Sequence, residues 1–161
     1  SSVGDVTEVS EYVRSLPNVV YSENTIFTCS QDTQERMKEV IKEHNLNRVV
    51  VAACSPRMHE PTFRRTVADA GLNPYLFEMA NIREFASWCH PSTPKEATEK
   101  AKEIVKMAVA KAKLLQRLET MIGEEIIDLR WLHKISHRRS FLRQTTVAFI
   151  GFRKLQNRPA P

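Results

Sequence analysis

The sequence predicts an α/β fold of three layers, in which helices cover both faces of a mainly parallel sheet and a long helix ends the domain. Strand-like and helix-like apolar patterns alternate along residues 1–121, which is typical of parallel sheets. The run Val49–Cys54 is almost entirely apolar, as expected for a central strand that is covered on both faces. Residues 122–161 lack such a pattern, so we divide the chain into an α/β domain (1–121) and a basic tail (122–161) of unclear fold.

Strands are expected where β-branched and aromatic residues cluster between turn signals. In chain order, the expected strands are Asn18–Tyr21, a short extended piece over Thr25–Thr28, Val49–Cys54 and Tyr75–Met79. In the tail, Thr146–Ile150 followed by Gly151 has the pattern of a strand and a turn. Because the long helix already closes the predicted core, we expect the domain to fold without residues 122–161.

Helices are expected where apolar residues recur every three or four positions between capping signals. Asp32 with Glu35, and Thr93 with Glu96, have the spacing of capping boxes. Asn45 suits the end of the helix that Asp32 begins. In chain order, the expected helices are Val6–Leu16, Asp32–Asn45, about Glu60 to Gly71, the short Ile82–Trp88 and the long Thr93–Leu118.

Three cysteines carry the most specific chemical signal. Cys29 and Cys54 each end an extended run and precede a predicted helix. The carboxyl ends of parallel strands meet at one sheet edge, where open α/β sheets bind ligands. We therefore expect these two sulfurs to lie within roughly 7 Å of each other, close enough to share a metal or iron–sulfur site. Cys89 would join them if the helix after Met79 folds back over that edge.

Four side chains near the later thiols are candidates for the same site. His59 and His90 could ligate a metal or donate a hydrogen bond to a cluster sulfur, and the simpler alternative is a surface histidine near a helix end. Arg57 and Arg83 could stabilise a thiolate by their charge. For each arginine, a salt bridge with a neighbouring glutamate is the alternative.

Composition and motif searches narrow the possible functions. No run approaches the roughly 18 apolar residues of a membrane span, and the first residues lack the features of a signal peptide, so a cytoplasmic protein is expected. The tail holds 8 basic and 3 acidic residues and carries the whole net charge of +5. Nucleic-acid binding would rest on this tail, which has no known motif, so no nucleic-acid partner is expected. The sequence also lacks P-loop, G-x-S-x-G and H-E-x-x-H motifs.

A long continuous run carries a family resemblance. It includes "NRVVVAACSPRMHEPTFRR" and "REFASW" and continues through "EATEKAKEIVKMAVAKAKLL". With these residues, positions 3–118 resemble the N-terminal region of the A subunit of heterodisulfide reductase. The family consists of flavin and iron–sulfur subunits of electron-transfer complexes. Its N-terminal domain is similar to a small α/β domain that carries a 4Fe-4S cluster.

The resemblance implies an electron-transfer module of a larger oxidoreductase complex. It implies that Cys29, Cys54 and Cys89 bind a 4Fe-4S cluster and that the partners are other subunits of a redox complex. FAD would bind only in a downstream domain of the family, because this chain has no G-x-G-x-x-G motif. The resemblance does not imply catalysis by this segment alone. A non-catalytic domain without a cluster, which docks redox partners, is the alternative.

Two departures from the family affect the cluster and the tail. Relatives carry a Cys-His-Cys-Gly segment just upstream, and three cysteines fall short of the four ligands that a 4Fe-4S cluster usually needs. The fourth ligand would be a histidine, an upstream cysteine or a residue of a partner chain. From about Arg117 the resemblance ends, which a disrupted reading frame or a different C-terminal extension would explain.

Overall fold

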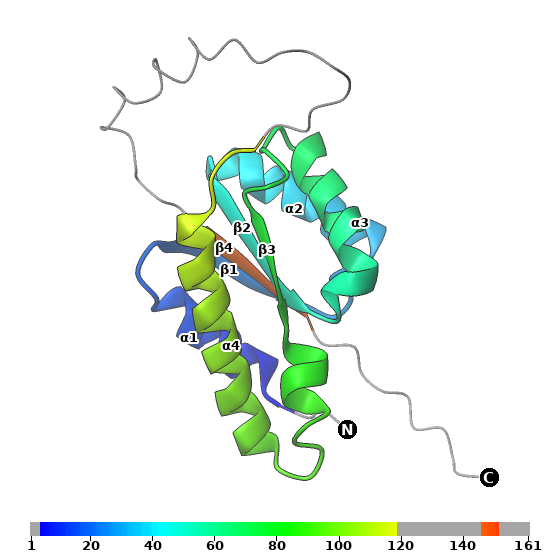
Figure 1. Cartoon of the computed structure of the whole chain (residues 1–161), viewed down its shortest axis with the longest axis vertical. Helices are drawn as coiled ribbons and strands as arrows, with labels where there is room; N and C mark the ends of the chain where they lie inside the picture. The colour runs from blue at the N-terminus through cyan, green and yellow to red at the C-terminus, as the bar shows by residue number, and fades with distance from the viewer. Residues whose placement is uncertain (1–3, 119–145, 152–161) are drawn as a thin grey trace, which may run out of the picture.

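A sheet of parallel strands is the centre of the computed structural model, which describes residues 4–118 and 146–151 (Figure 1). The strands of this described part are β1 (Val19–Thr25), β2 (Arg48–Ala53), β3 (Phe77–Asn81) and β4 (Thr146–Gly151). Their spatial order is β1-β4-β2-β3, and each neighbouring pair is parallel. The predicted α/β class with a parallel sheet is confirmed.

Helices cover both faces of this sheet (Figure 1). One face packs against α1 (Val6–Arg14) and α4 (Pro94–Leu114), and the other packs against α2 (Gln31–Glu43) and α3 (Pro56–Asp69). A one-turn π-helix, η1 (Arg83–Ser87), links β3 to the long helix α4. Within the part of the chain that the structure describes, no helix is both long enough and apolar enough to cross a lipid bilayer.

The strand β2 explains why the core has two halves. Val50 and Ala52 belong to the hydrophobic cluster under α1 and α4, whereas Val49 and Val51 belong to the cluster under α2 and α3. All four side chains are fully buried. Because successive side chains of a strand point to opposite faces, an apolar run of this kind fits only a strand covered on both sides. The predicted central strand is confirmed.

The strand β4 comes from the segment that the sequence pattern set apart as a tail. It lies between β1 and β2: Gly151 pairs with Thr25 of β1, and Val147 pairs with Val49 of β2. The predicted strand over Thr146–Ile150 is therefore confirmed, and this part of the tail belongs to the sheet. Its position argues against the expectation that the domain folds without residues 122–161. The other tail residues lie outside the described part of the chain.

Helix ends differ from the predicted ones for local reasons. The α2 helix begins behind Ser30, whose hydroxyl accepts a hydrogen bond from the Thr33 amide at 3.4 Å, so Asp32 does not start a capping box. The α3 helix begins at Pro56, four residues earlier than expected, because proline is favoured in the first turn of a helix. Asn45 ends α2 in the left-handed conformation as predicted, with a φ of 48°.

Arg48 ties the start of β2 to the end of the long helix. Its guanidinium donates hydrogen bonds to the carbonyl oxygens of Ala112 at 3.1 Å and Leu115 at 2.7 Å. Ala112 lies in the last turn of α4, where carbonyls lack the usual partner one turn further on, and Leu115 directly follows the helix, so this side chain caps the end of α4. Burial lowers the pKa of Arg48 from its ordinary value. The contact fixes the end of α4 against the start of β2.

Replacement of Ala148 by proline tests the place of β4 in the sheet. Ala148 pairs with Ser22 on one side and Val50 on the other, and proline has no N–H and a fixed φ. We expect the full chain with Ala148→Pro to lose about 1–3 kcal/mol of its free energy of unfolding in urea, because a ladder hydrogen bond is lost and its acceptor is left without a donor. The control Gln31→Pro places proline at the first position of α2, where proline is tolerated, and should unfold like the parent. A chain with Ala148→Pro that unfolds at the same urea concentration as this control would contradict the pairing.

Candidate thiol site

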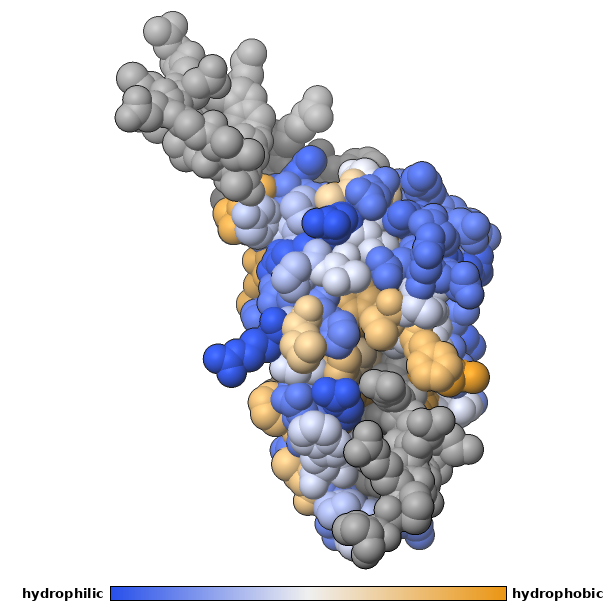
Figure 2. All heavy atoms as spheres, turned by 90° about the vertical axis from the view of Figure 1, so that its right-hand side faces the viewer, coloured by the Kyte–Doolittle hydropathy of each residue, from blue (hydrophilic) through white to orange (hydrophobic). Residues whose placement is uncertain are grey.

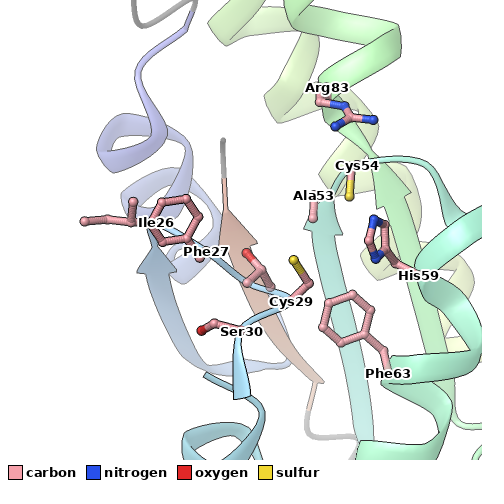
Figure 3. A pocket seen from close by; sticks show the side chains of 10 residues that line it. Ile26, Phe27, Cys29, Ser30, Ala53, Cys54, His59, Phe63 and Arg83 are labelled. Atoms are coloured by element: carbon pink, nitrogen blue, oxygen red, sulfur yellow. The ribbon is translucent and has the colours of Figure 1, made fainter. Parts of the chain in front are cut away.

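A pocket with a volume of about 390 Å³ opens at the carboxyl edge of the sheet (Figure 3). Cys29 and Cys54 both line it, as do His59 and Phe63 of α3 and Arg83 of η1. The remaining lining residues are Ile26, Phe27, Thr28, Ser30 and Ala53. The volume falls within the range of small-ligand sites. The structure therefore brings Cys29 and Cys54 to one edge, as expected, and their role as ligands stays a prediction.

Cys29 reaches the pocket from a turn and not from the end of a strand. β1 is one strand from Val19 to Thr25, with an irregularity in its register between Val19 and Tyr21, so the separate extended piece expected over Thr25–Thr28 is absent from the described structure. The hydroxyl groups of Thr25 and Thr28 share a hydrogen bond of 2.9 Å, which closes the turn. The Gln34 side chain donates to the Cys29 carbonyl at 3.0 Å. The turn leaves the Cys29 thiol exposed at the mouth of the pocket.

Cys54 follows directly after β2 and is half-buried. Burial raises the pKa of the Cys54 thiol from its ordinary value. The charge of Arg83 acts in the opposite direction and lowers this pKa, whereas Cys29 and Glu84 raise it. Because the net direction is upward, Cys54 holds its proton more firmly than an ordinary cysteine does.

Cys89 and His90 are not among the residues that line this pocket. The exposed thiol of Cys89 donates a hydrogen bond of 3.2 Å to the carbonyl oxygen of Glu84, at the base of η1. The Nδ1 atom of His90 lies 3.3 Å from the Glu96 carboxylate. Arg57 is exposed on α3, also outside the lining. Of the sequence-predicted candidates, the structure gathers Cys29, Cys54, His59 and Arg83.

The pocket offers the kind of ligand that an iron–sulfur cluster takes, but too few of these ligands. Cys29 and Cys54 carry thiol groups, whose thiolate form is the soft ligand that such clusters take, and a 4Fe-4S cluster takes four ligands. In the residues that the structure describes, no group of three or more histidine, cysteine or acidic side chains could hold a metal ion. A 4Fe-4S cluster at this pocket would therefore need ligands beyond these two thiols.

Large apolar side chains stand exposed on the segments that form the pocket, a feature that the sequence pattern did not predict. We call this set the apolar rim: Ile26, Phe27, Met58, Phe85 and Trp88, which are 52% to 75% exposed. They come from the turn of Cys29, the start of α3 and η1. Figure 2 shows hydrophobic side chains gathered among hydrophilic ones on one face of the molecule. An apolar pair such as Ile26-Phe27 within a turn was the available sequence signal.

Alkylation of the three thiols tests this geometry. In the metal-free chain at neutral pH, we expect iodoacetamide to modify Cys29 and Cys89 before Cys54, because burial shields Cys54 and raises its pKa. Raising the pH above the ordinary thiol range should speed Cys54 as it loses its proton. Peptide mass spectrometry of timed samples measures the three rates. The control is the chain in urea, where the rates should converge, and equal rates in the folded chain would contradict the assignment.

Comparison with known proteins finds relatives among heterodisulfide reductase subunits. The iron-sulfur A subunit numbered 2 of the CoB–CoM heterodisulfide reductase of Methanopyrus kandleri is 59% identical over 121 residues, which is 75% of this chain and 18% of the relative. The A subunit of the H(2):CoB-CoM heterodisulfide,ferredoxin reductase of Methanothermobacter marburgensis is 58% identical over 117 residues, 73% of this chain and 18% of the relative. No family model matches the chain.

The similarity extends to a more distant relative. The iron-sulfur A subunit of the CoB–CoM heterodisulfide reductase of Methanocaldococcus jannaschii is 44% identical over 124 residues, 77% of this chain and 19% of the relative. The chain thus spans less than a fifth of the length of the relatives that it matches. Identity at this level over three quarters of the chain confirms the resemblance. About three quarters of this chain is therefore homologous to the N-terminal region of the A subunit of heterodisulfide reductase.

Proposed function

We propose that this chain is an electron-transfer module of a heterodisulfide-reductase-like subunit and that Cys29 and Cys54 are ligands of an iron–sulfur cluster. The observation that carries the proposal is the meeting of these two thiols, 25 residues apart in sequence, in one pocket at the carboxyl edge of a parallel sheet. The homology supports it, because two of the relatives are named as iron–sulfur subunits.

The pocket's own residues suit such a role. A bound cluster would supply one-electron transfer, with a potential that depends on burial, charge and hydrogen bonds around it. Phe63 is fully buried and Ala53 nearly so, and together they form an apolar wall that excludes water. Arg83 brings a positive charge to offset thiolate charge, and His59 brings an N–H that can donate to sulfur.

The remaining ligands must come from elsewhere, and the length of the relatives supports a source in the same subunit. More than four fifths of each matched relative lies outside the region shared with this chain. We assign the missing ligands to that part of such a subunit or to another subunit of a redox complex. Cys89 would contribute only if the segment after η1 moved. FAD would bind in the rest of the subunit, and a cytoplasmic complex is the expected setting.

Anaerobic reconstitution tests the proposal. The full chain is incubated with ferric iron, sulfide and excess small thiol, which reduces part of the iron and can complete the ligand set. We expect the broad visible absorbance of an iron–sulfur cluster, with bound iron and sulfide in matching amounts. Cys29→Ser and Cys54→Ser should each abolish it, and the control Cys89→Ser should retain it. Absorbance that survives both the Cys29 and Cys54 substitutions, or that never forms, would refute the proposed ligands.

The apolar rim favours a second candidate function, an interaction domain that docks redox partners without a cluster of its own. Five large apolar side chains exposed on neighbouring segments are typical of a protein–protein contact. On this interpretation the pocket edge is a docking surface, and the thiols are small residues beneath it. Docking and cluster binding can also coexist, so the two candidates are separated by whether the cluster forms.

Substitution within the apolar rim tests the docking surface. The partner in this test is the remaining part of the Methanopyrus kandleri subunit, produced as a separate chain. We expect Met58→Ser with Phe85→Ser to weaken binding by about tenfold or more, because buried apolar anchors dominate interface energies. The control Met107→Ser changes a side chain of similar exposure, 60%, on α4. Calorimetry gives the dissociation constants of both variants. Equal weakening by the control would show that binding does not depend specifically on the apolar rim.

A further inference from the structure

The turn that carries Cys29 is not anchored by apolar side chains. Ile26 and Phe27 of this turn are 72% and 56% exposed, and Cys29 itself is exposed. Of the side chains between β1 and α2, only that of Thr28 is buried. The hydrophobic effect scales with the apolar area removed from water, so it contributes little to the position of this turn. Hydrogen bonds must therefore hold the turn in place.

Gln34 of α2 joins this turn to α3. Its side-chain amide donates to the Cys29 carbonyl at 3.0 Å, and its Oε1 atom lies 2.9 Å from the hydroxyl oxygen of Thr66. A carbonyl only accepts, so the NH₂ group of Gln34 must face Cys29, and Oε1 is left to accept from the hydroxyl. The Thr62 carbonyl also lies within reach of this hydroxyl, at 3.0 Å, but a carbonyl inside an α-helix already accepts from the backbone.

Thr66 lies on the face of α3 that forms a wall of the pocket. It follows Phe63 by three residues and His59 by seven, a spacing that places all three on one side of a helix. Phe63 and Thr66 are buried, and Figure 3 shows Cys29, His59 and Phe63 around the same pocket. Gln34 therefore links the turn of Cys29 to this wall.

We infer that Gln34 is a positioning residue of the thiol pocket, whose side chain fixes Cys29 relative to α3. Cys54 stands two residues before the first residue of α3, so a turn that is tied to this helix is also held relative to Cys54. The link exists in the metal-free chain, and only its consequence for a cluster rests on the proposed function. A pair of thiols that is already in place loses less conformational freedom when one ligand binds both of them.

The test is the binding of phenylarsine oxide to the full, metal-free chain with Cys89→Ser. This arsenical condenses with two neighbouring thiols: two As–S bonds form, and the oxygen leaves as water with both thiol protons. With Gln34→Leu we expect the dissociation constant to rise about twofold to tenfold, the range that corresponds to one lost hydrogen bond. Gln34→Glu keeps the acceptor and lacks the donor, so it should also weaken binding. The control Gln31→Leu changes an exposed residue of α2 and should bind like the parent.

Amide hydrogen exchange separates positioning from general stability. The Ser30 amide donates to the Phe27 carbonyl at 3.0 Å within the turn, whereas the Val50 amide belongs to the central strand β2. We expect Gln34→Leu to speed exchange at Ser30 and to leave exchange at Val50 unchanged. Equal acceleration at both amides would show a loss of global stability and would overturn the inference. An unchanged dissociation constant for the arsenical would overturn it as well.

Substitution of Thr66 covers the case in which Gln34→Leu does not fold. Thr66→Ser keeps the hydroxyl and should bind the arsenical like the parent, whereas Thr66→Val removes it and should weaken binding. Equal binding by these two variants would refute the link to α3.

The outcomes distinguish this inference from the proposed function. If Cys29 and Cys54 of the parent do not bind the arsenical together, the shared site of the proposed function fails. Exchange at Ser30 in Gln34→Leu then still decides the role of Gln34. If the Gln34 variants behave like the parent in a chain that assembles a cluster, this inference alone fails.

Discussion

The parallel pairing of β2 with both of its neighbours is the constraint on which the chemistry of this domain depends. The register joins Ala53 to Asn81 of β3 and Ala52 to Ile150 of β4, so these strands end at the same level. Parallel strands place all of their following loops at one edge. Cys54 and Arg83 arrive at that edge directly after β2 and β3, and Cys29 arrives in the turn after β1. A single backbone arrangement thus gathers groups that are far apart in sequence.

Burial and the charge of Arg83 have opposite effects on the pKa of the Cys54 thiol. An apolar wall and a half-buried position raise the pKa of Cys54, which disfavours a free thiolate, while Arg83 favours it. A metal centre binds thiolates and releases their protons, so binding at such a site would become stronger as the pH rises. The same wall would protect a bound cluster from water. In the empty pocket the protonated form of the Cys54 thiol is therefore favoured. A bound metal centre would compensate the negative charge of the Cys54 thiolate.

The sequence predicted the layers of the fold better than the details of the site, and the difference has a physical basis. The doubly buried run Val49–Cys54 has few alternatives to a central strand, and its neighbouring helices follow from periodicity. The turn after Thr25 depends on side-chain hydrogen bonds between residues of modest local preference, so an extended piece was expected there instead. The place of β4 depends on pairing across more than 90 residues, which local patterns do not reveal. The Nε atom of Arg83 is buried without a hydrogen-bond partner among the described residues, which depends on three-dimensional packing alone.

One docked segment at the carboxyl edge of the sheet could both supply the missing cluster ligands and cover the exposed apolar rim. The thiol pocket offers two cysteines where a cluster takes four ligands, and the apolar rim leaves Met58, Phe85 and Trp88 in water. Both lie on the segments that follow the carboxyl ends of the strands, and the chain spans less than a fifth of its relatives' length. On the proposed function, a docked segment that presents ligands to the pocket would also cover the rim. Covering the rim would remove water from around Arg83 and strengthen its interaction with sulfur, because charge interactions grow as the local dielectric falls. Docking and the properties of the bound cluster would then be coupled through the same few residues.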